Sequence, residues 1–220
     1  SAARGFVTDT IVNQGATSLP ADGHETNVIN FPVSWNVAAD SVGINSYALE
    51  VSNSPAFANM VFTDTVSGSA SSDTVTGLYN DTYYWRVRAI DDLGNGGVFS
   101  AAPGFVTDTR VNTAVLSSPA DGYETKAFSV VVIWNAVSDS VGIDSYALEV
   151  SAGSVFTNLV FTDTVDALLT SGTITGLYDT SFVWRVRAVD DLGNVGSNSA
   201  SRQIVADTIS PRITRIGDTS

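Results

Sequence analysis

The stretch YYWRVRA at residues 83–89 decides the fold of this chain, and it returns as FVWRVRA at residues 182–188. Apolar and basic residues alternate within it, and a period of two places alternate side chains on opposite faces of a β-strand. Trp85 and Val87 are therefore expected to face a core, while Arg86 faces outward. No window of the chain shows a helical period, so the sequence predicts an all-β protein.

The two copies of this stretch belong to a repeat with a fixed offset of 99 residues. The offset relates four predicted core tryptophans in two pairs, Trp35 with Trp134 and Trp85 with Trp184. A period near one hundred with several short strands inside it indicates two copies of one all-β module. Turn residues between the strands predict two tandem β-sandwiches, at residues 11–109 and 110–208.

Composition excludes several classes of function. The net charge is −13 over 220 residues, which argues against nucleic acid as a partner, because its phosphates would be repelled. This charge suits a secreted protein, although solubility alone explains it equally well. The chain has no cysteine, so disulfides and thiolate metal sites are excluded. No apolar run approaches the roughly 18 residues of a membrane span.

The ends of the chain look like parts of further modules. Residues 5–10 (GFVTDT) duplicate residues 104–109, so residues 1–10 are interpreted as the last strand of a preceding module. Residues 209–220 are interpreted as a linker or the start of a next module. One explanation is a piece of a longer array; another is strand exchange, in which the leading strand completes a sheet in a neighbouring subunit. The candidate assembly residues are Phe6, Val7, Phe105, Val106, Ile204 and Val205.

The repeat resembles a bacterial fibronectin type III domain. The residues that carry the resemblance are Trp35, 77–91 and 94–95 in the first copy, and Trp134, 176–177 and 184–194 in the second. The resemblance covers nearly the whole chain and implies an immunoglobulin-like sandwich. Domains of this family are spacers or binding modules in secreted and surface proteins. Their ligands bind to loops, so the fold does not transfer a ligand to this chain.

The resemblance also implies a tyrosine on the sixth strand whose hydroxyl bonds back across the preceding corner. Tyr83 occupies that position, but its counterpart is Phe182, which lacks the hydroxyl. The second module is therefore expected to lack this hydrogen bond or to replace it with other contacts.

Acidic residues follow the second and the sixth strand of each copy. In a type III sandwich these two loops share one pole, which also receives the chain from the preceding module. Three acidic segments would then converge at each junction, and oxygen ligands from several loops suit calcium, which takes six to eight of them. The alternative is that Asp, Gly and Asn are simply turn formers. The candidate calcium ligands are Asp9, Asp40, Asp91, Asp92, Asn95, Asp108, Asp139, Asp190, Asp191 and Asn194.

Residues suited to catalysis are scarce. His24 is the only histidine, it follows a glycine in a predicted surface turn, and its counterpart is Tyr123. No serine can be paired with a base, and no glycine-rich phosphate loop precedes a helix. The sequence therefore predicts that the chain is not an enzyme.

The outer face of each module offers charged and aromatic residues. Glu50 is expected to pair across strands with Arg86 or Arg88, and each such pair contributes about 0.2–1 kcal/mol. A sugar-binding platform would need exposed aromatic residues; Tyr84 is one, but its counterpart is Val183. This difference favours structure over sugar binding.

We therefore expect a structural function outside the cell or at its surface. The modules would act as a spacer or as the repeating unit of a filament, surface layer or adhesin stalk, with other copies or neighbouring modules as partners. Two similar copies with no distinguishing site favour this hypothesis. The alternative is a binding or accessory module of a secreted enzyme or adhesin, with a surface glycan or a protein as its ligand.

Overall fold

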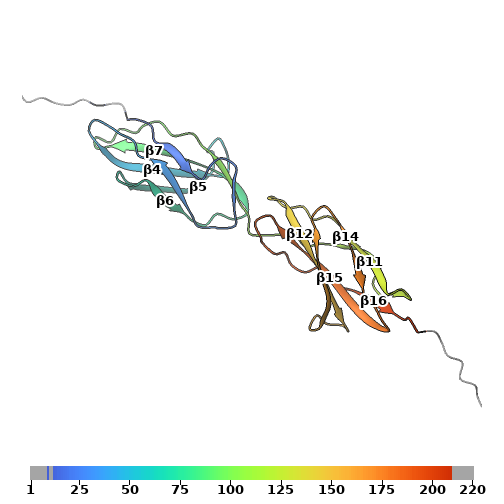
Figure 1. The fold of residues 1–220 in the computed structure, drawn as a ribbon. Coiled ribbons are helices and arrows are strands. Elements are labelled where there is room, and N and C mark those ends of the chain that lie inside the picture. The colour runs from blue at the N-terminus through green and yellow to red at the C-terminus, as the bar shows by residue number, and fades with distance from the viewer. Residues whose placement is uncertain (1–8, 10–11, 210–220) are drawn as a thin grey trace, which may run out of the picture. The chain divides into compact units, whose positions relative to one another are not determined.

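The computed structural model describes Asp9 and residues 12–209, and the chain divides into two units, Ser1–Thr109 and Arg110–Ser220. Every regular element among the described residues is a β-strand (Figure 1). No helix in this part of the chain is long and apolar enough to cross a membrane. Each unit is built from two sheets, so the prediction of an all-β chain with two tandem sandwiches is confirmed.

The first unit contains eight strands among its described residues. They are β1 (Ala16–Leu19), β2 (His24–Thr26), β3 (Phe31–Asn36), β4 (Ile44–Ser52), β5 (Met60–Ser67), β6 (Ser72–Val75), β7 (Asp81–Asp91) and β8 (Gly104–Thr107). One sheet has the order β1-β3-β6 and the other the order β2-β8-β7-β4-β5. All pairings are antiparallel except β2 with β8.

The second unit repeats this topology with eight further strands. They are β9 (Leu116–Ser118), β10 (Tyr123–Thr125), β11 (Ser129–Trp134), β12 (Ile143–Ala152), β13 (Leu159–Asp166), β14 (Ser171–Thr175), β15 (Thr180–Asp190) and β16 (Arg202–Ala206). The sheet orders are β14-β11-β9 and β10-β16-β15-β12-β13. Strand for strand, the two units have the same arrangement.

The strand that decides the fold, β7, lies inside the five-stranded sheet and places one apolar face against the core. Trp85, Val87 and Ala89 are fully buried, and Tyr83 is nearly so. Trp35 reaches the same core from β3 of the opposite sheet. In the second unit Trp134 and Trp184 occupy the equivalent positions. The predicted inward faces and core tryptophans are therefore confirmed, and both sheets of a unit share one core.

Proline in the middle of a sheet removes a ladder hydrogen bond, and Pro32 lies in β3, the central strand of its sheet. On one side it pairs with Thr74 of β6. On the other side β1 pairs only with residues 34–36 of β3. The side of β3 next to Pro32 is therefore free of a β1 partner, so the strand accommodates the proline as its second residue.

The turn after β1 carries the chain from one sheet to the other, because β1 and β2 belong to opposite sheets. The carboxylate of Asp22 fixes this crossing by accepting a hydrogen bond from the backbone N–H of Gly104 at 2.7 Å. The Asp121 carboxylate makes the equivalent bond with Gln203 at 2.6 Å. His24 is exposed and opens β2, where its ring stacks on Phe31 at 6.0 Å. It is a surface residue as predicted, but it lies in a short strand and not in a turn.

The expected tyrosine bond is present in the first unit. The Tyr83 hydroxyl donates to the carbonyl of Tyr79 at 3.2 Å and accepts from the backbone N–H of the same residue at 3.1 Å. In the second unit Phe182 instead packs edge-on against the ring of Tyr178 at 5.5 Å. In the second unit an aromatic contact therefore replaces the hydrogen bond of the first unit.

Replacing Trp85 or Trp184 by alanine is expected to lower the free energy of unfolding of the affected module by about 3–5 kcal/mol, because the lost ring leaves a cavity. Urea unfolding followed by circular dichroism measures the loss. The exposed Val98→Ala change serves as the control and should cost less than about 0.5 kcal/mol. A tryptophan variant as mild as the control would show that the inward face is misassigned.

Tyr83→Phe is expected to cost about 0.5–1.5 kcal/mol, because it removes one hydroxyl that serves two backbone groups. Tyr84→Phe, which removes a hydroxyl from the outer face of the same strand, should be nearly neutral. Thermal unfolding of both variants makes the comparison. Equal effects at the two positions would contradict a stabilising role for the corner bond.

Candidate functional site

The loop that follows β7 is closed by the buried carboxylate of Asp91. One oxygen accepts hydrogen bonds from the backbone N–H groups of Leu93 and Asn95 at 2.9 and 2.7 Å, and the other accepts from the side-chain amide of Asn95 at 2.7 Å. This is the pattern by which an aspartate forms its own turn. Both carboxylate oxygens of Asp91 are thus used within the loop.

The second unit repeats this loop in detail. The buried carboxylate of Asp190 accepts from the backbone N–H groups of Leu192 and Asn194 at 3.0 and 2.7 Å, and from the Asn194 side chain at 2.7 Å. The motif of aspartate followed four residues later by asparagine therefore builds one loop twice. The turn-forming role that the sequence left open is shown for both copies.

Hydrogen bonding also sets the charge state of Asp91. Burial by itself raises the pKa of this carboxyl group, but the bonds from the Asn95 side chain and from the backbone N–H groups of the loop outweigh it and lower the pKa. A carboxylate that accepts several N–H bonds is stabilised in its ionised form. Asp91 is therefore an anion held by its own loop at neutral pH.

The loop that follows β3, and β11 in the second unit, lies beside the loop that follows β7 or β15. Gly43 approaches the carboxylate of Asp92 so closely that a Cβ atom would come within 2.9 Å of its oxygen, and Gly142 approaches Asp191 in the same way at 2.6 Å. Both glycines have a φ near +100°, which side chains rarely adopt. The two acidic loops therefore share one pole of each sandwich, as the sequence predicted.

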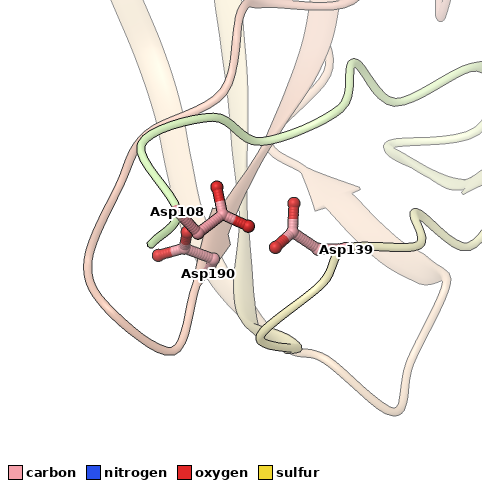
Figure 2. Close-up of side chains that lie close together, drawn as sticks. All are labelled: Asp108, Asp139 and Asp190. Carbon is pink, nitrogen blue, oxygen red and sulfur yellow. The ribbon is translucent and has the colours of Figure 1, made fainter. Parts of the chain in front are cut away.

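Two further acidic residues of these loops also form turns. The carboxylate of Asp40 accepts the N–H of Val42 at 3.2 Å, and that of Asp139 accepts the N–H of Val141 at 3.3 Å. Figure 2 shows Asp139 with Asp190, and a carboxylate oxygen of each lies within 4.8 Å of the other. Turn formation and close approach of carboxylates thus occur together at this pole.

The segment that enters the first unit is fastened to the same pole. The Asn95 side-chain amide donates to the carbonyl of Asp9 at 2.9 Å, and the Ser41 hydroxyl donates to the Asp9 carboxylate. Asp108, also drawn in Figure 2, follows β8, and within the first unit its N–H donates to the carbonyl of Thr26 at 2.9 Å. The predicted convergence of three segments is present at the pole of the first unit.

The segment that leaves each unit is fastened by a residue that the sequence did not single out. The Asn80 side-chain oxygen accepts from the backbone N–H and the hydroxyl of Thr109 at 2.7 and 3.0 Å. Asp179 makes the same two bonds with Thr208 at 2.5 and 2.6 Å, and these bonds lower the pKa of its carboxyl group. The two partners of each pair are 29 residues apart, so no strand or helix period connects them in the sequence. The offset of 99 residues does relate one pair to the other.

Calcium binding by the acidic residues stays a prediction. Asp91 and Asp190 already serve as loop acceptors, and calcium requires six to eight oxygen ligands. The pair Asp139 and Asp190 supplies fewer than that within the second unit.

The two described strands that carry candidate assembly residues pair within their own modules. Each lies between two partners of its own module, β8 between β2 and β7, and β16 between β10 and β15. Phe105 and Ile204 are fully buried in their own cores, and assembly through these strands stays a prediction. Val106 and Val205 belong to the same strands, whereas Phe6 and Val7, with the rest of residues 1–8, lie outside the described residues.

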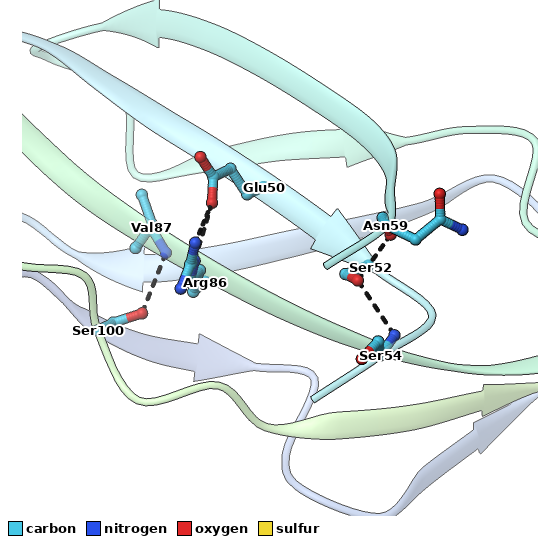
Figure 3. Close-up of polar contacts among 7 residues, drawn as sticks. All are labelled: Glu50, Ser52, Ser54, Asn59, Arg86, Val87 and Ser100. Carbon is cyan, nitrogen blue, oxygen red and sulfur yellow. Dashed lines mark hydrogen bonds and ion pairs between the residues drawn. The ribbon is translucent and has the colours of Figure 1, made fainter. Parts of the chain in front are cut away.

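The outer face of the five-stranded sheet carries the predicted ion pair. Arg86 donates to the Glu50 carboxylate from two nitrogens at 2.8 and 2.7 Å (Figure 3). Its guanidinium also lies 3.9 Å from the ring centres of both Phe57 and Phe99. The ion pair is confirmed for Arg86, and the aromatic contacts with Phe57 and Phe99 add cation–π attraction to it.

The second unit repeats the ion pair with a different aromatic environment. Arg185 and Arg187 lie 2.7 and 3.6 Å from Glu149, and Phe156 lies 4.0 Å from the Arg185 guanidinium. The position equivalent to Phe99 is Asn198. The outer face of each unit therefore carries an arginine that is paired with a glutamate and lies over a phenylalanine ring, Arg86 in the first unit and Arg185 in the second.

Acidification is expected to destabilise the first module through Asp91. A lowered folded pKa means that Asp91 contributes stability above its unfolded pKa of about 3.9, and that this contribution is lost as the pH falls through the folded value. Thermal unfolding between about pH 2 and pH 7 measures the effect. Asp91→Asn should reduce the slope below about pH 4, whereas the exposed Asp92→Asn should keep it. Identical slopes for the wild type and Asp91→Asn would contradict the role of this carboxylate.

Comparison with known proteins gives two curated relatives. The chain is 30% identical over 217 residues to chitinase A1 of Niallia circulans, which covers 92% of this chain and 28% of the relative. It is 30% identical over 201 residues to exoglucanase B of Cellulomonas fimi, which covers 88% of this chain and 17% of the relative. The chain thus spans less than a third of either enzyme. No protein-family model matches it.

Solved structures with similarity to the chain include two sets of modules. The chicken CNTN1 FN1–FN3 domains are 15% identical, with a TM-score of 0.45 over 93% of this chain and 69% of theirs. The fibronectin(III)-like modules of Clostridium thermocellum CbhA are 14% identical, with a TM-score of 0.39 over 91% of this chain and 99% of theirs.

The family assignment follows from this chain's own sheets and motifs together with its relatives. Each unit has a three-stranded sheet packed on a five-stranded one, with a tryptophan from each sheet in the shared core. The corner tyrosine and the run from Trp85 to Asp91 take the places that the resemblance assigns to them. The chain is a tandem pair of fibronectin type III-like β-sandwich modules.

Proposed function

We propose that this pair of modules is a non-catalytic accessory part of a larger extracellular enzyme that degrades a polysaccharide. The observation that carries the proposal is the coverage of the relatives. The match to chitinase A1 includes both modules and 92% of this chain, but only 28% of the enzyme. The match to exoglucanase B covers 88% of this chain but only 17% of the enzyme. A segment related to part of two polysaccharide-degrading enzymes is explained most simply as a module that accompanies a catalytic domain.

Within such an enzyme the pair would act as a spacer. Chain segments at the poles are held by hydrogen bonds of the adjoining module, from Asn95 at the beginning and from Asn80 and Asp179 at the two ends. Arg86 and Arg185 are paired with glutamates and lie over phenylalanine rings. Fastened ends and filled faces support a role in separating domains, and neighbouring domains of the same protein are then the main partners.

A stalk or filament, which the sequence also suggested, would use the modules as spacers in the same way. Its strand-exchange version depends on residues 1–10, of which only Asp9 lies within the described part of the chain. Assembly of this kind therefore stays a prediction, and the two enzyme relatives favour the accessory role.

The proposal is tested by incubating the purified chain with insoluble chitin and with insoluble cellulose. We expect no release of soluble sugar from either polymer, because the chain would lack the catalytic part of the enzyme. Reducing-end assays and sedimentation of the polymer provide the measurements, with a catalytic chitinase as the positive control. Sugar release by the chain would contradict the non-catalytic role, and saturable binding to one polymer would replace the spacer role by carbohydrate binding.

A further inference from the structure

The outer side of the three-stranded sheet in the second unit is unusually apolar. β11 lies between β14 and β9 in this sheet, and the strand turns its alternate residues Val131 and Ile133 to solvent. Val115 precedes β9, and Leu168 and Leu169 form the turn before β14. These five side chains are between 38% and 92% exposed. Together these five residues form the outer apolar face.

The register shows that these residues lie at neighbouring positions. Ile133 pairs with Ser118 on one side and with Ser171 on the other. The N–H of Asn135 donates to the carbonyl of Val115 at 2.8 Å, and the N–H of Trp134 donates to the carbonyl of Thr170 at 3.0 Å. The segments that carry Val115 and the two leucines therefore flank the same end of β11.

The first unit has the same topology but a less apolar face, on which Leu19 is exposed at the position of Ser118. With the offset of 99 residues, the five apolar residues correspond to Ala16, Pro32, Ser34, Ser69 and Ala70. Every large aliphatic side chain of the face is thus replaced by a small, polar or proline residue. An apolar surface of this extent, found in one of two equivalent sandwiches, is not required by the fold. Larger patches of this kind mark interaction sites.

Charge identifies the partner that this face suits. None of the three strands β9, β11 and β14 contains an acidic or basic residue, whereas the chain as a whole has a net charge of −13. Two copies would repel each other over most of their surfaces. At the outer apolar face they can meet without bringing charged strands together, and depletion of charge is typical of the centre of an interface.

The available area also fits a pair of identical faces. A fully exposed Val, Leu or Ile side chain offers on the order of 100 Å² of apolar surface. With the exposures given above, the five side chains provide about 300 Å² of apolar surface per copy, about half of the 600 Å² per partner at the lower end of specific interfaces. The Ser and Thr residues between them extend the contact, so the area fits a weak pairing. The β-branched Val131 and Ile133 also resemble the inward residues of a sandwich, where two sheets pack about 10 Å apart.

We propose that the outer apolar face is a self-association surface, through which two copies of the chain pack their second modules sheet against sheet. The contact is isologous, so the same residues of both copies meet around a twofold axis. It is weak, with a dissociation constant on the order of 100 µM. Because it is apolar, it persists or strengthens as salt screens the repulsion between the acidic chains.

The experiment is sedimentation velocity of the whole chain from about 10 µM to about 1 mM, at low and at high salt. We expect a concentration-dependent dimer in both salts. Ile133→Ser combined with Leu168→Ser installs the residues of the first unit and should weaken dimerisation at least about tenfold. Leu159→Ser combined with Val160→Ser removes similar exposed apolar side chains from β13 and should leave the dimer unchanged. A wild-type chain that remains monomeric overturns the proposal, as does equal weakening by the two double variants.

A charge pair provides a second test that does not depend on the loss of apolar groups. Thr173 is exposed on β14 and pairs with Val131. Thr173→Glu and Thr173→Lys should each weaken dimerisation strongly, because each homodimer then carries two like charges within one small uncharged contact. An equimolar mixture should restore it as a heterodimer in which the two charges are opposite. Dimers of either variant alone at the wild-type concentration would overturn the proposal. Thermal unfolding of each variant verifies that the sandwich is intact.

Discussion

Burial of a tryptophan from each of two facing sheets is the interaction on which each module depends. Trp85 and Trp184 are fully buried, and their indole nitrogens have no hydrogen-bond partner among the described residues, nor have those of Trp35 and Trp134. An unpaired buried donor costs about 1–3 kcal/mol, and the 3–5 kcal/mol that a buried tryptophan contributes relative to alanine is what remains after that cost. The rings are therefore favourable only where both sheets enclose them closely, and this requirement ties the three-stranded sheet to the five-stranded one.

The loops and outer faces follow from that arrangement. The strands on either side of the core end at poles, where backbone N–H groups without ladder partners need acceptors. The Asp91 and Asp190 carboxylates provide such acceptors locally, for the backbone N–H groups of Asn95 and Asn194. The outer side of β7 and β15 is closed by paired arginines. Since the same solutions appear in both modules, they belong to the fold, and the features that distinguish the copies are the ones that point to partners.

The sequence predicted strands correctly where apolar and polar side chains alternate strongly. It predicted the role of a side chain only where that residue type has a single plausible function. The period of two around Trp85 identified the core strand, and its repetition identified two modules. The short strands β1 and β2 gave no such signal, since their residues are mostly exposed. The acidic residues were ambiguous, because a carboxylate that forms a turn and one that binds a cation need the same oxygen atoms. Only the bonds of Asp91 to its own loop separate these roles, and the exposure of Val131 and Ile133 required the register of the sheet.

The central claim is that the chain consists of two separate sandwiches, each stabilised by its own core. Pulling single molecules by their two ends tests this claim most directly. Each module holds about one hundred residues, and an extended chain spans about 3.3–3.6 Å per residue. Two separate cores should give two distinct unfolding events that each release about 30 nm of chain. One event that releases the whole length at once would show a common core and would contradict the claim.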